Sequence, residues 1–343
     1  MANQSINNKL AEIHYRRLSA KQHTENNKLL ENEPDQAEFK QLITPKLKET
    51  GKRFQDLQKK GIVLSPYLEI GSEHCLRPMI LENQLNANGF AVDISVHSLI
   101  SAKKYAKIFH FKKLPKIICA DAYNLPFKSN SIPFIFIYET LHHFPEPQPV
   151  IDEIYRVLSP GGYLLIGGDP IKQQFQLPIW RRPNRLRLWE KFLKAIFVLP
   201  FISQIGKTET EYGIIETAFD LKTWRKSLSR FARIEAEIEV FPFGILEKTE
   251  NKKLDISWPV KTGLFLLGGG IRAVCLKEGK RKVTSGMNIL ICPNCKKRYK
   301  KEFLLVKRAE KLKCNKCKTH YAKFQNVQTI LERNLFEKIA RNK

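Results

Sequence analysis

Residues 67–170 repeat one pattern, in which a short apolar segment runs into an acidic or glycine-containing turn and then into a helical segment. The apolar segments are YLEI, FAVD, KIIC, IPFIFIY and YLLI. EIYRVLSPGG, before the last of them, is typical of a helix that stops at a Gly-Gly turn. Strands that alternate with helices predict βαβ units and a parallel sheet. The pattern therefore indicates an α/β domain with helices on both faces of the sheet.

Polar residues follow the ends of the first three segments. Ligands of parallel sheets bind outside the carboxyl ends of the strands. Gly71 lets the backbone approach a ligand closely, because glycine has no Cβ. Asp93 comes 22 residues later (93 minus 71), close to the spacing at which a carboxylate accepts hydrogen bonds from ribose hydroxyls. Asp121 and Ala122 could bind an adenine edge through a carboxylate and a backbone N–H. Together these positions predict an adenosine-bearing ligand.

Three longer motifs, DAYNLPFKSNS, ETLHHF and EIYRVLSPGGYLLI, occur in that order. With them the chain resembles the class I S-adenosylmethionine-dependent methyltransferases over residues 67–170, and more weakly to about residue 275. The resemblance implies a Rossmann-like sheet and S-adenosylmethionine as cofactor. It also implies the following contacts: Glu69 and Gly71 with the methionine end, Asp93 with the ribose, and Asp121 and Ala122 with the adenine. Ile94 and Glu139 are further expected cofactor-binding residues.

The loop after the first strand departs from this family. The usual Glu-x-Gly-x-Gly-x-Gly becomes Glu69, Gly71, Glu73 and Cys75, so two glycines are replaced. Glu73 adds a Cβ and a negative charge where the cofactor carboxylate would approach, which disfavours binding. Three interpretations stay open: a shifted loop that still binds, a weak or different cofactor, and a domain that has lost catalysis. The first is favoured because the other motifs are intact.

Two simpler interpretations compete with a methyltransferase site. Nicotinamide dinucleotides need G-x-G-x-x-G at the start of the helix, and the sequence after Gly71 lacks the second glycine. Taken one at a time, Gly71 could be a plain turn and Asp93 a helix cap before Ser95. Only the ordered set of motifs favours the cofactor site.

His142 and His143 follow the fourth apolar segment, where a methyl acceptor would enter. Methyl transfer is an in-line displacement, so holding the acceptor close and aligned supplies most of the rate. A base is needed only if the acceptor loses a proton, and histidine is suited to that role near neutral pH. A His pair at such a turn is more often structural, and we keep both as candidate catalytic residues. Glu139 is expected to form part of the pocket rather than to catalyse.

Four cysteines near the carboxyl terminus form two C-x-x-C pairs with eighteen residues between them: Cys292 and Cys295, then Cys314 and Cys317. This spacing predicts two hairpins that hold a tetrahedral zinc ion. Four thiolates fill the coordination sphere, so the predicted site is structural. Two disulfides are disfavoured because no signal peptide is recognised and the other cysteines fall within apolar segments. Redox chemistry would require a thioredoxin-like unit, which the sequence does not show.

The sequence around these cysteines, over residues 289–332, resembles small zinc-ribbon proteins that bind and activate methyltransferases. The resemblance implies that the ribbon docks on the catalytic domain of its own chain. A fold of this size usually needs its metal, so chelation is expected to unfold it.

The chain is strongly basic, with 59 Lys and Arg against 34 Asp and Glu and a formal net charge of +25. Residues 277–323 contain sixteen Lys or Arg against three Glu. A second basic segment, WRRPNRLRLWEKFLK at 180–194, interleaves Arg with aromatic residues. Such surfaces bind nucleic acid by stacking and by phosphate neutralisation. For the second segment we rank a lid over the active site first, nucleic acid second and a membrane surface third.

The expected organisation is an N-terminal helical segment (1–62), a methyltransferase domain (63–280) with an insertion at 170–218, a zinc ribbon (287–332) and a basic tail (333–343). The N-terminal segment could cap the cofactor or bind a partner. No apolar run reaches the length of a membrane span, and a cytoplasmic location is expected. Residues 264–275 are interpreted as a late strand of the sheet. The expected function is methyl transfer to an unidentified acceptor; the alternatives are an RNA methyltransferase and a catalytically silent scaffold.

Overall fold

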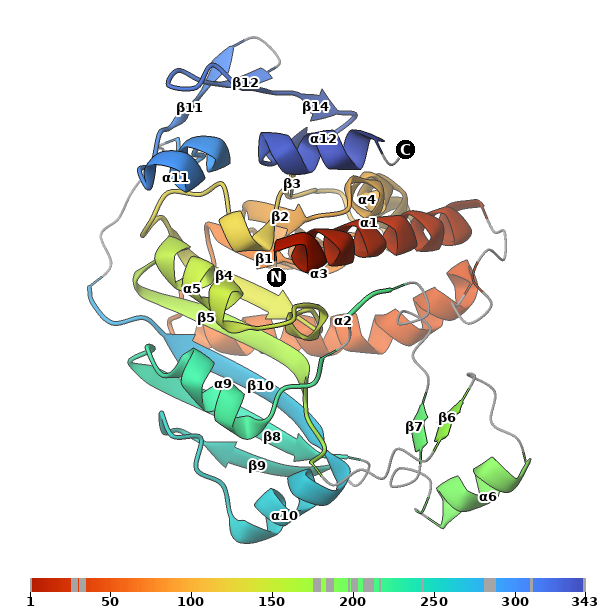
Figure 1. The fold of residues 1–343 in the computed structure, drawn as a ribbon. Helices are drawn as coiled ribbons and strands as arrows, with labels where there is room; N and C mark the ends of the chain where they lie inside the picture. The colour runs from red at the N-terminus through yellow and green to blue at the C-terminus, as the bar shows by residue number, and fades with distance from the viewer. Residues whose placement is uncertain are drawn as a thin grey trace. The chain divides into compact units, whose positions relative to one another are not determined.

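The computed structural model describes residues 2–25, 30, 35–174, 180–182, 188–196, 198, 203–205, 213–215, 217–241, 244–280, 288–308 and 311–341 (Figure 1). The chain divides into two compact units. Unit 1 comprises Met1–Ile137, Pro149–Leu164 and Lys277–Lys343. Unit 2 comprises Tyr138–Gln148 and Leu165–Leu276.

Unit 1 carries a mostly parallel sheet with helices packed on it. Its N-terminal and central elements are α1 (Ala2–Glu25), α2 (Gln36–Lys59), β1 (Tyr67–Ile70), α3 (Leu76–Gln84), β2 (Gly89–Asp93), α4 (Val96–Ile108), β3 (Lys116–Cys119), η1 (Ala122–Asn124), β4 (Ile132–Tyr138), α5 (Gln148–Val157) and the first half of β5 (Leu158–Ile171).

The strand order in unit 1 is β14-β15-β3-β2-β1-β4-β5. Strand β1 pairs in parallel with β2 on one side and with β4 on the other. The chain order therefore reverses between β1 and β4, and such a reversal opens a crevice at the carboxyl ends of the strands. The α/β sheet with flanking helices expected from the sequence is confirmed.

The central strands are mostly apolar because the sheet is covered on both faces. All four residues of β1 are buried, as are the first six of β4. One detail of the sequence interpretation is wrong. Helix α5 ends at Val157 and the chain enters β5 directly, so the Gly-Gly pair lies inside a strand rather than in a turn. A Cβ on Gly162 would lie 2.8 Å from the carbonyl oxygen of Pro133, so the close packing requires glycine.

The N-terminal residues form two helices of unit 1. Helix α2 begins with a capping box, in which Asp35 accepts hydrogen bonds from Ala37 N and Glu38 N while Glu38 accepts one from Asp35 N. Its buried face includes Phe54, whose ring packs edge-on against Phe136 of β4. Helix α1 packs along α4.

The C-terminal part of unit 1 contains the cysteine pairs. Its elements are α11 (Pro293–Tyr299), β11 (Leu305–Arg308), β12 (Lys311–Cys314), β13 (His320–Tyr321), β14 (Lys323–Phe324), β15 (Val327–Thr329) and α12 (Arg333–Arg341). Strands β11, β12 and β13 form a small antiparallel sheet. The first C-x-x-C pair does not form the expected hairpin, because it opens helix α11. We call residues 288–332 the ribbon.

The ribbon also joins the central sheet. Strand β15 pairs in parallel with β3, with Gln328 opposite Ile118 and Thr329 opposite Cys119. The amide of Ile330 continues the ladder by donating to the carbonyl oxygen of Cys119 (2.9 Å). The edge strand of the βαβ pattern is therefore extended by residues more than two hundred positions away in sequence.

Unit 2 holds the second half of β5 and the remaining elements: η2 (Leu141–His143), β6 (Trp180–Arg182), α6 (Leu188–Ala195), β7 (Ser203–Ile205), α9 (Leu221–Leu228), β8 (Arg233–Val240), β9 (Ile245–Thr249), α10 (Trp258–Leu267) and β10 (Gly269–Leu276). The strand order here is β5-β10-β8-β9, and β10, β8 and β9 pair antiparallel.

Two expectations concern unit 2. Residues 264–275 are not one strand, because α10 continues to Leu267 and β10 begins at Gly269; Gly268 separates them with a φ of 71°. The lid expected within 170–218, with its basic segment at 180–194, lies mostly outside the described residues. Among the helices that the structure describes, none is long and apolar enough to cross a membrane.

Candidate functional site

The loop between β1 and α3 keeps left-handed backbone at alternate residues. The φ angles are 72° at Gly71, 46° at Glu73 and 60° at Cys75. These are the three positions at which the resemblance leads us to expect glycine, and left-handed backbone favours glycine because a Cβ is crowded there. The two replaced glycines therefore add side chains while the backbone keeps conformations that glycine adopts most readily.

Asp93, at the end of β2, holds this loop in place. One carboxylate oxygen accepts a hydrogen bond from Glu73 N (2.9 Å) and the other from Ser95 N (2.8 Å). Burial raises the pKa of Asp93 to about 6. Each carboxylate oxygen can accept two hydrogen bonds, so the carboxylate keeps capacity for the expected ribose hydroxyls. The neighbouring carbonyl of Ile94 accepts a hydrogen bond from the Cys119 thiol (3.3 Å).

Glu69 is the most buried acid of the site, at 1% exposed. Burial raises its pKa to about 8, against the nearby positive charge of Arg77. Within the described part of the chain, its Oε2 has no hydrogen-bond partner. A buried polar atom without a partner costs stability, so this oxygen suits a ligand that donates, such as the ammonium of an amino acid.

Two cations of α1 reach the acidic positions of this site. Arg16 Nη1 lies 3.2 Å from Glu73 Oε1, and Lys9 Nζ lies 2.5 Å from Asp121 Oδ2. The sequence left the role of the N-terminal segment open between a cap and a partner-binding arm. The two ion pairs place α1 beside Glu73 and Asp121 of unit 1.

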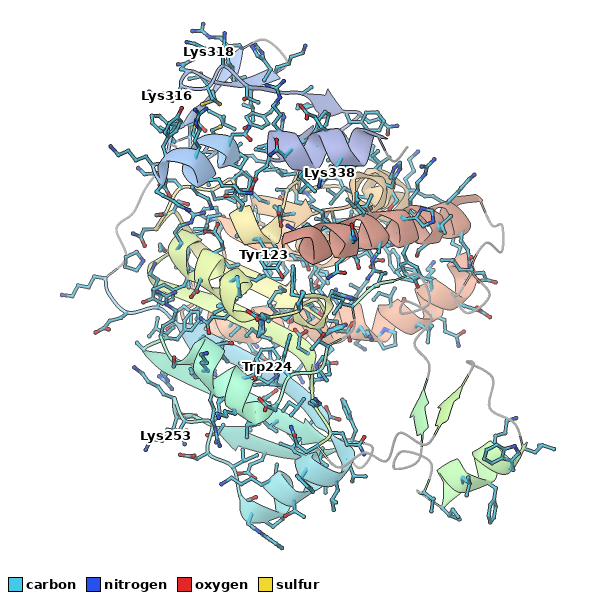
Figure 2. The ribbon with its side chains drawn as sticks, in the orientation of Figure 1. Tyr123, Trp224, Lys253, Lys316, Lys318 and Lys338 are labelled. Atoms are coloured by element: carbon cyan, nitrogen blue, oxygen red, sulfur yellow. The ribbon has the colours of Figure 1, made fainter. Side chains whose placement is uncertain are left out.

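Asp121 and Ala122 lie at the end of β3. The carboxylate of Asp121 caps η1 by accepting from Tyr123 N (3.0 Å), and Ala122 is the first residue of η1. Lys9 lies over the ring of Tyr123, 4.8 Å from its centroid; Figure 2 labels Tyr123. A cavity of about 820 Å³ opens beside Asp121 and reaches the ribbon and α12. It is lined by Lys9, Asp121, Tyr123, Asn124, Glu153, Arg156, Lys296, Lys297, Lys300, Glu332, Asn334, Leu335, Glu337 and Lys338.

The histidine pair belongs to unit 2, where His142 binds a buried acid. Nδ1 of His142 lies 3.0 Å from Oδ1 of Asp169, which is fully buried near the end of β5. Burial raises the pKa of Asp169 despite this contact. The ring of His143 packs against that of His142 at a centroid distance of 4.3 Å. Asp169 was not predicted from the sequence, where its signal is an acid directly after Gly167 and Gly168, near the end of the fifth strand.

Glu139 lies between β4 and the histidines. Its backbone is left-handed, with a φ of 45°, and its amide donates to the carbonyl oxygen of Gly167 (2.9 Å). Gly167 has no room for a side chain, because a Cβ would lie 2.2 Å from the ring of Tyr138. The turn that carries Glu139 and the histidines is therefore tied to β5 within unit 2.

The four cysteines of the ribbon form one cluster. Ligand atoms of Cys292, Cys295, Cys314 and Cys317 all lie within 4.8 Å of one another. Two sulfur pairs lie 3.5 Å and 3.6 Å apart. In a tetrahedral site with Zn–S bonds of about 2.3 Å, the sulfurs are separated by roughly 3.8 Å. The donor set and its spacing fit a four-coordinate zinc ion.

The comparison with protein families gives one match. The family described as a methyltransferase domain matches residues 68–166, which run from β1 into β5. No curated protein matches the chain.

Solved structures give weaker likenesses. An S-adenosylmethionine-dependent methyltransferase from Thermotoga maritima is 15% identical, with a TM-score of 0.41, and covers 76% of this chain and 100% of its own. A methyltransferase candidate from Bacillus halodurans is also 15% identical, with a TM-score of 0.40, and covers 66% of this chain and 98% of its own. At these scores neither structure carries an argument about function, and the match to the methyltransferase domain family extends over residues 68–166.

Proposed function

We propose that the protein is an S-adenosylmethionine-dependent methyltransferase. The observation that carries the proposal is the set of acids at the carboxyl ends of β1, β2 and β3, in a segment that matches the methyltransferase domain family. The buried oxygen of Glu69, without a partner among the described residues, supports it from the structure.

Each chain residue has a defined part in this proposal. Bound S-adenosylmethionine would supply an activated methyl group on a sulfonium. Asp93 would accept hydrogen bonds from the ribose hydroxyls and Glu69 from the ammonium group. Asp121 would exchange its contact with Lys9 for the adenine amine, and the amide of Ala122 would donate to the same edge. The left-handed loop at residues 71–75 would let its backbone approach the methionine portion.

His142 is the candidate base. Asp169 binds Nδ1, which leaves Nε2 as the nitrogen available to take a proton from an acceptor. His143 packs on the ring of His142, and it is His142 that contacts Asp169. The arrangement favours His142 over His143 in this role.

Calorimetric titration with S-adenosylmethionine and S-adenosylhomocysteine tests cofactor binding. Wild-type protein is expected to bind both, and Asp93→Asn to bind both more weakly by about tenfold or more, because a charged acceptor is lost. Lys112→Gln, on the exposed loop before β3, is the control and should bind like wild type. If the wild type binds neither compound, the alternative of a catalytically silent scaffold is favoured.

The role of His142 is tested by transfer from methyl-labelled S-adenosylmethionine to the acceptor. His142→Ala should reduce the rate by roughly 100-fold or more, as for loss of a general base, and added imidazole should restore part of it. His143→Ala should retain most of the activity. A rate unchanged in His142→Ala would indicate that the acceptor needs no base and that the histidine is structural.

We further propose that the four cysteines hold a structural zinc ion. All four positions of a tetrahedral site would be thiolates, which leaves none for substrate. The zinc would stabilise the ribbon, and through β15 it would stabilise the edge of the sheet at β3. A cytoplasmic location is kept in this proposal because zinc-bound thiolates persist in a reducing compartment.

A second candidate function is methylation of RNA. The ribbon exposes a basic surface made of Lys300, Lys301, Lys307, Arg308, Lys311, Lys316, Lys318 and Lys323. Lys316 and Lys318 project from the ribbon (Figure 2), and Lys316 lies 5.5 Å from the ring centroid of the partly exposed Tyr299. Cations beside exposed rings suit phosphates and unstacked bases.

Salt dependence tests this second candidate. Affinity for single-stranded RNA should fall steeply between low and physiological salt, because counterions are released on binding. The double variant Lys316→Gln with Lys318→Gln should bind RNA more weakly, and its affinity should depend less steeply on salt concentration. The double variant Lys252→Gln with Lys253→Gln in unit 2 should show neither change. Binding that does not respond to salt, or no binding, would count against an RNA substrate.

A further inference from the structure

Two cations on α1 face the acids of the cofactor positions. Lys9 and Arg16 are seven residues apart (16 minus 9), which is close to two helical turns and places them on one face. Each side chain is only 18% exposed, and each is paired with an acid from a loop at the carboxyl end of a strand. Helix α1 thus brings positive charge to a site whose own loops are acidic.

A positive charge would favour ligand binding most beside Glu73, where negative charges gather. Glu73, Asp93 and Glu69 lie close enough to affect one another, since Glu73 and Asp93 both contribute to the raised pKa of Glu69 after the larger effect of burial. The amino-acid end of an S-adenosyl ligand carries a carboxylate as well as an ammonium. A further negative charge beside Glu73 would be repelled unless a cation were close.

Arg16 is the cation in that place. Its Nη1 contacts Glu73 Oε1 (3.2 Å), its Nε donates to Glu12 Oε1 (2.8 Å), and its charge acts on Asp93. A guanidinium carries five N–H donors in a planar fork that matches carboxylates. The group can therefore hold more than one carboxylate at a time.

We propose that Arg16 binds the carboxylate of the amino-acid portion of the S-adenosyl ligand, and that it offsets the charge that Glu73 brings to the loop. This inference rests on the proposed function. It makes α1 part of the binding site and explains how a loop with Glu73 in place of glycine accommodates an anionic group.

The competing explanation is that the Arg16–Glu73 pair only fixes α1 on the unit. A ligand that lacks the amino-acid carboxylate distinguishes this explanation from direct binding by Arg16. 5′-Methylthioadenosine keeps the adenosine and the sulfur but lacks the amino acid, so an effect through α1 would change its affinity as much as that of S-adenosylhomocysteine.

The experiment titrates both compounds into wild type, Arg16→Gln and Arg17→Gln by calorimetry. Arg17 is the matched control, because it is the next residue of the same helix and is exposed. Arg16→Gln is expected to lose roughly 10- to 100-fold in affinity for S-adenosylhomocysteine, as for a charge-assisted hydrogen-bonded pair, and less than about twofold for 5′-methylthioadenosine. Arg17→Gln is expected to match wild type with both.

Equal losses for the two compounds, or no loss for either, would overturn the inference. If Arg16→Gln does not fold, the double variant Arg16→Gln with Glu73→Gln removes the unpaired charge, and the same selective loss is expected from it. The outcomes also separate the two proposals. If the wild type binds neither compound, the proposed function is contradicted. If the wild type binds both compounds and Arg16→Gln binds them with the same affinities, only the role of Arg16 is contradicted.

Discussion

The cysteine cluster and the loop at residues 71–75 are both sites in unit 1, but different interactions hold them. In the cluster, four identical side chains converge on one point and can share a metal ion. In the loop, left-handed backbone persists although two residues are not glycine, and it is fixed by Asp93 and by an ion pair with α1. A site built from side chains can be read from residue types, whereas one built from backbone depends on contacts from distant segments.

Removal of zinc is expected to have the largest effect. Structural zinc sites supply on the order of 10 kcal/mol of binding free energy that is coupled to folding. Chelation should therefore expose the amides of residues 288–332 to hydrogen exchange, while β1 and β2 remain protected. Added zinc should restore protection, and metal analysis should find one ion per chain. Unchanged protection in the ribbon after the metal is removed would contradict a structural role.

Glu153→Gln should have the next largest effect. The carboxylate of Glu153 on α5 binds Lys296 of the ribbon, Arg156 and the amide of Leu125. Burial alone would raise its pKa, but the hydrogen bonds and charges of Arg156 and Lys296 lower it. Loss of this largely buried charge should reduce the free energy of unfolding by about 2–3 kcal/mol in urea titrations. Glu302→Gln, which leaves Arg156 its contact with Glu153, should cost less than about 1 kcal/mol.

The loop is tested by the pH dependence of ligand binding. The pKa of Asp93 is raised to about 6 by burial, so the protonated form is favoured in the free protein below that pH. A ribose hydroxyl donates to the ionised form, so affinity for S-adenosylhomocysteine should be lost as pH falls through 6. About a tenfold loss is expected one unit below the pKa. Asp93→Asn should bind weakly without this dependence, and a flat wild-type profile between pH 5 and 7 would show that Asp93 does not contact the ligand.

Glu73→Gly should have the smallest effect on stability. Glycine at this left-handed position removes a strain of about 1 kcal/mol from the folded state. The contact with Arg16 that is lost stabilises the fold by a similar amount or less. The midpoint of thermal unfolding should therefore change little. Gly71→Ala is the matched contrast, because it adds a Cβ at a φ of 72° and should destabilise by about 1 kcal/mol. A large loss in Glu73→Gly would mean that the ion pair, rather than Asp93, holds the loop.

Much of the sheet could be predicted from the sequence. Its parallel strands are covered on both faces, so β1, β2, β3 and β4 appear as short, mostly apolar segments. The four cysteines could be found because their spacing alone carries the signal. The interpretation of residues 264–275 was wrong because a buried helix end and a buried strand have the same apolar composition, and only Gly268 marks the change.

The contacts that complete the site could not be predicted. Arg16 and Glu73 are 57 residues apart, and Lys9 and Asp121 are 112 apart. Asp169 meets His142 only because β5 returns beside the turn after β4. Each of these pairs joins residues whose types are common on any surface, so no local pattern marks them. The roles of the cofactor positions and of the histidines remain predictions for the experiments above.

The pairing of β15 with β3 has a consequence for how the protein behaves as an assembly. A bare edge strand can recruit a strand from another molecule, and such recruitment depends on concentration. Here the strand that covers β3 belongs to the same polypeptide, so its local concentration is set by the connecting chain and does not fall on dilution. Each sheet is therefore supplied with one copy of the covering strand, and no second gene product is needed to cover the edge at β3.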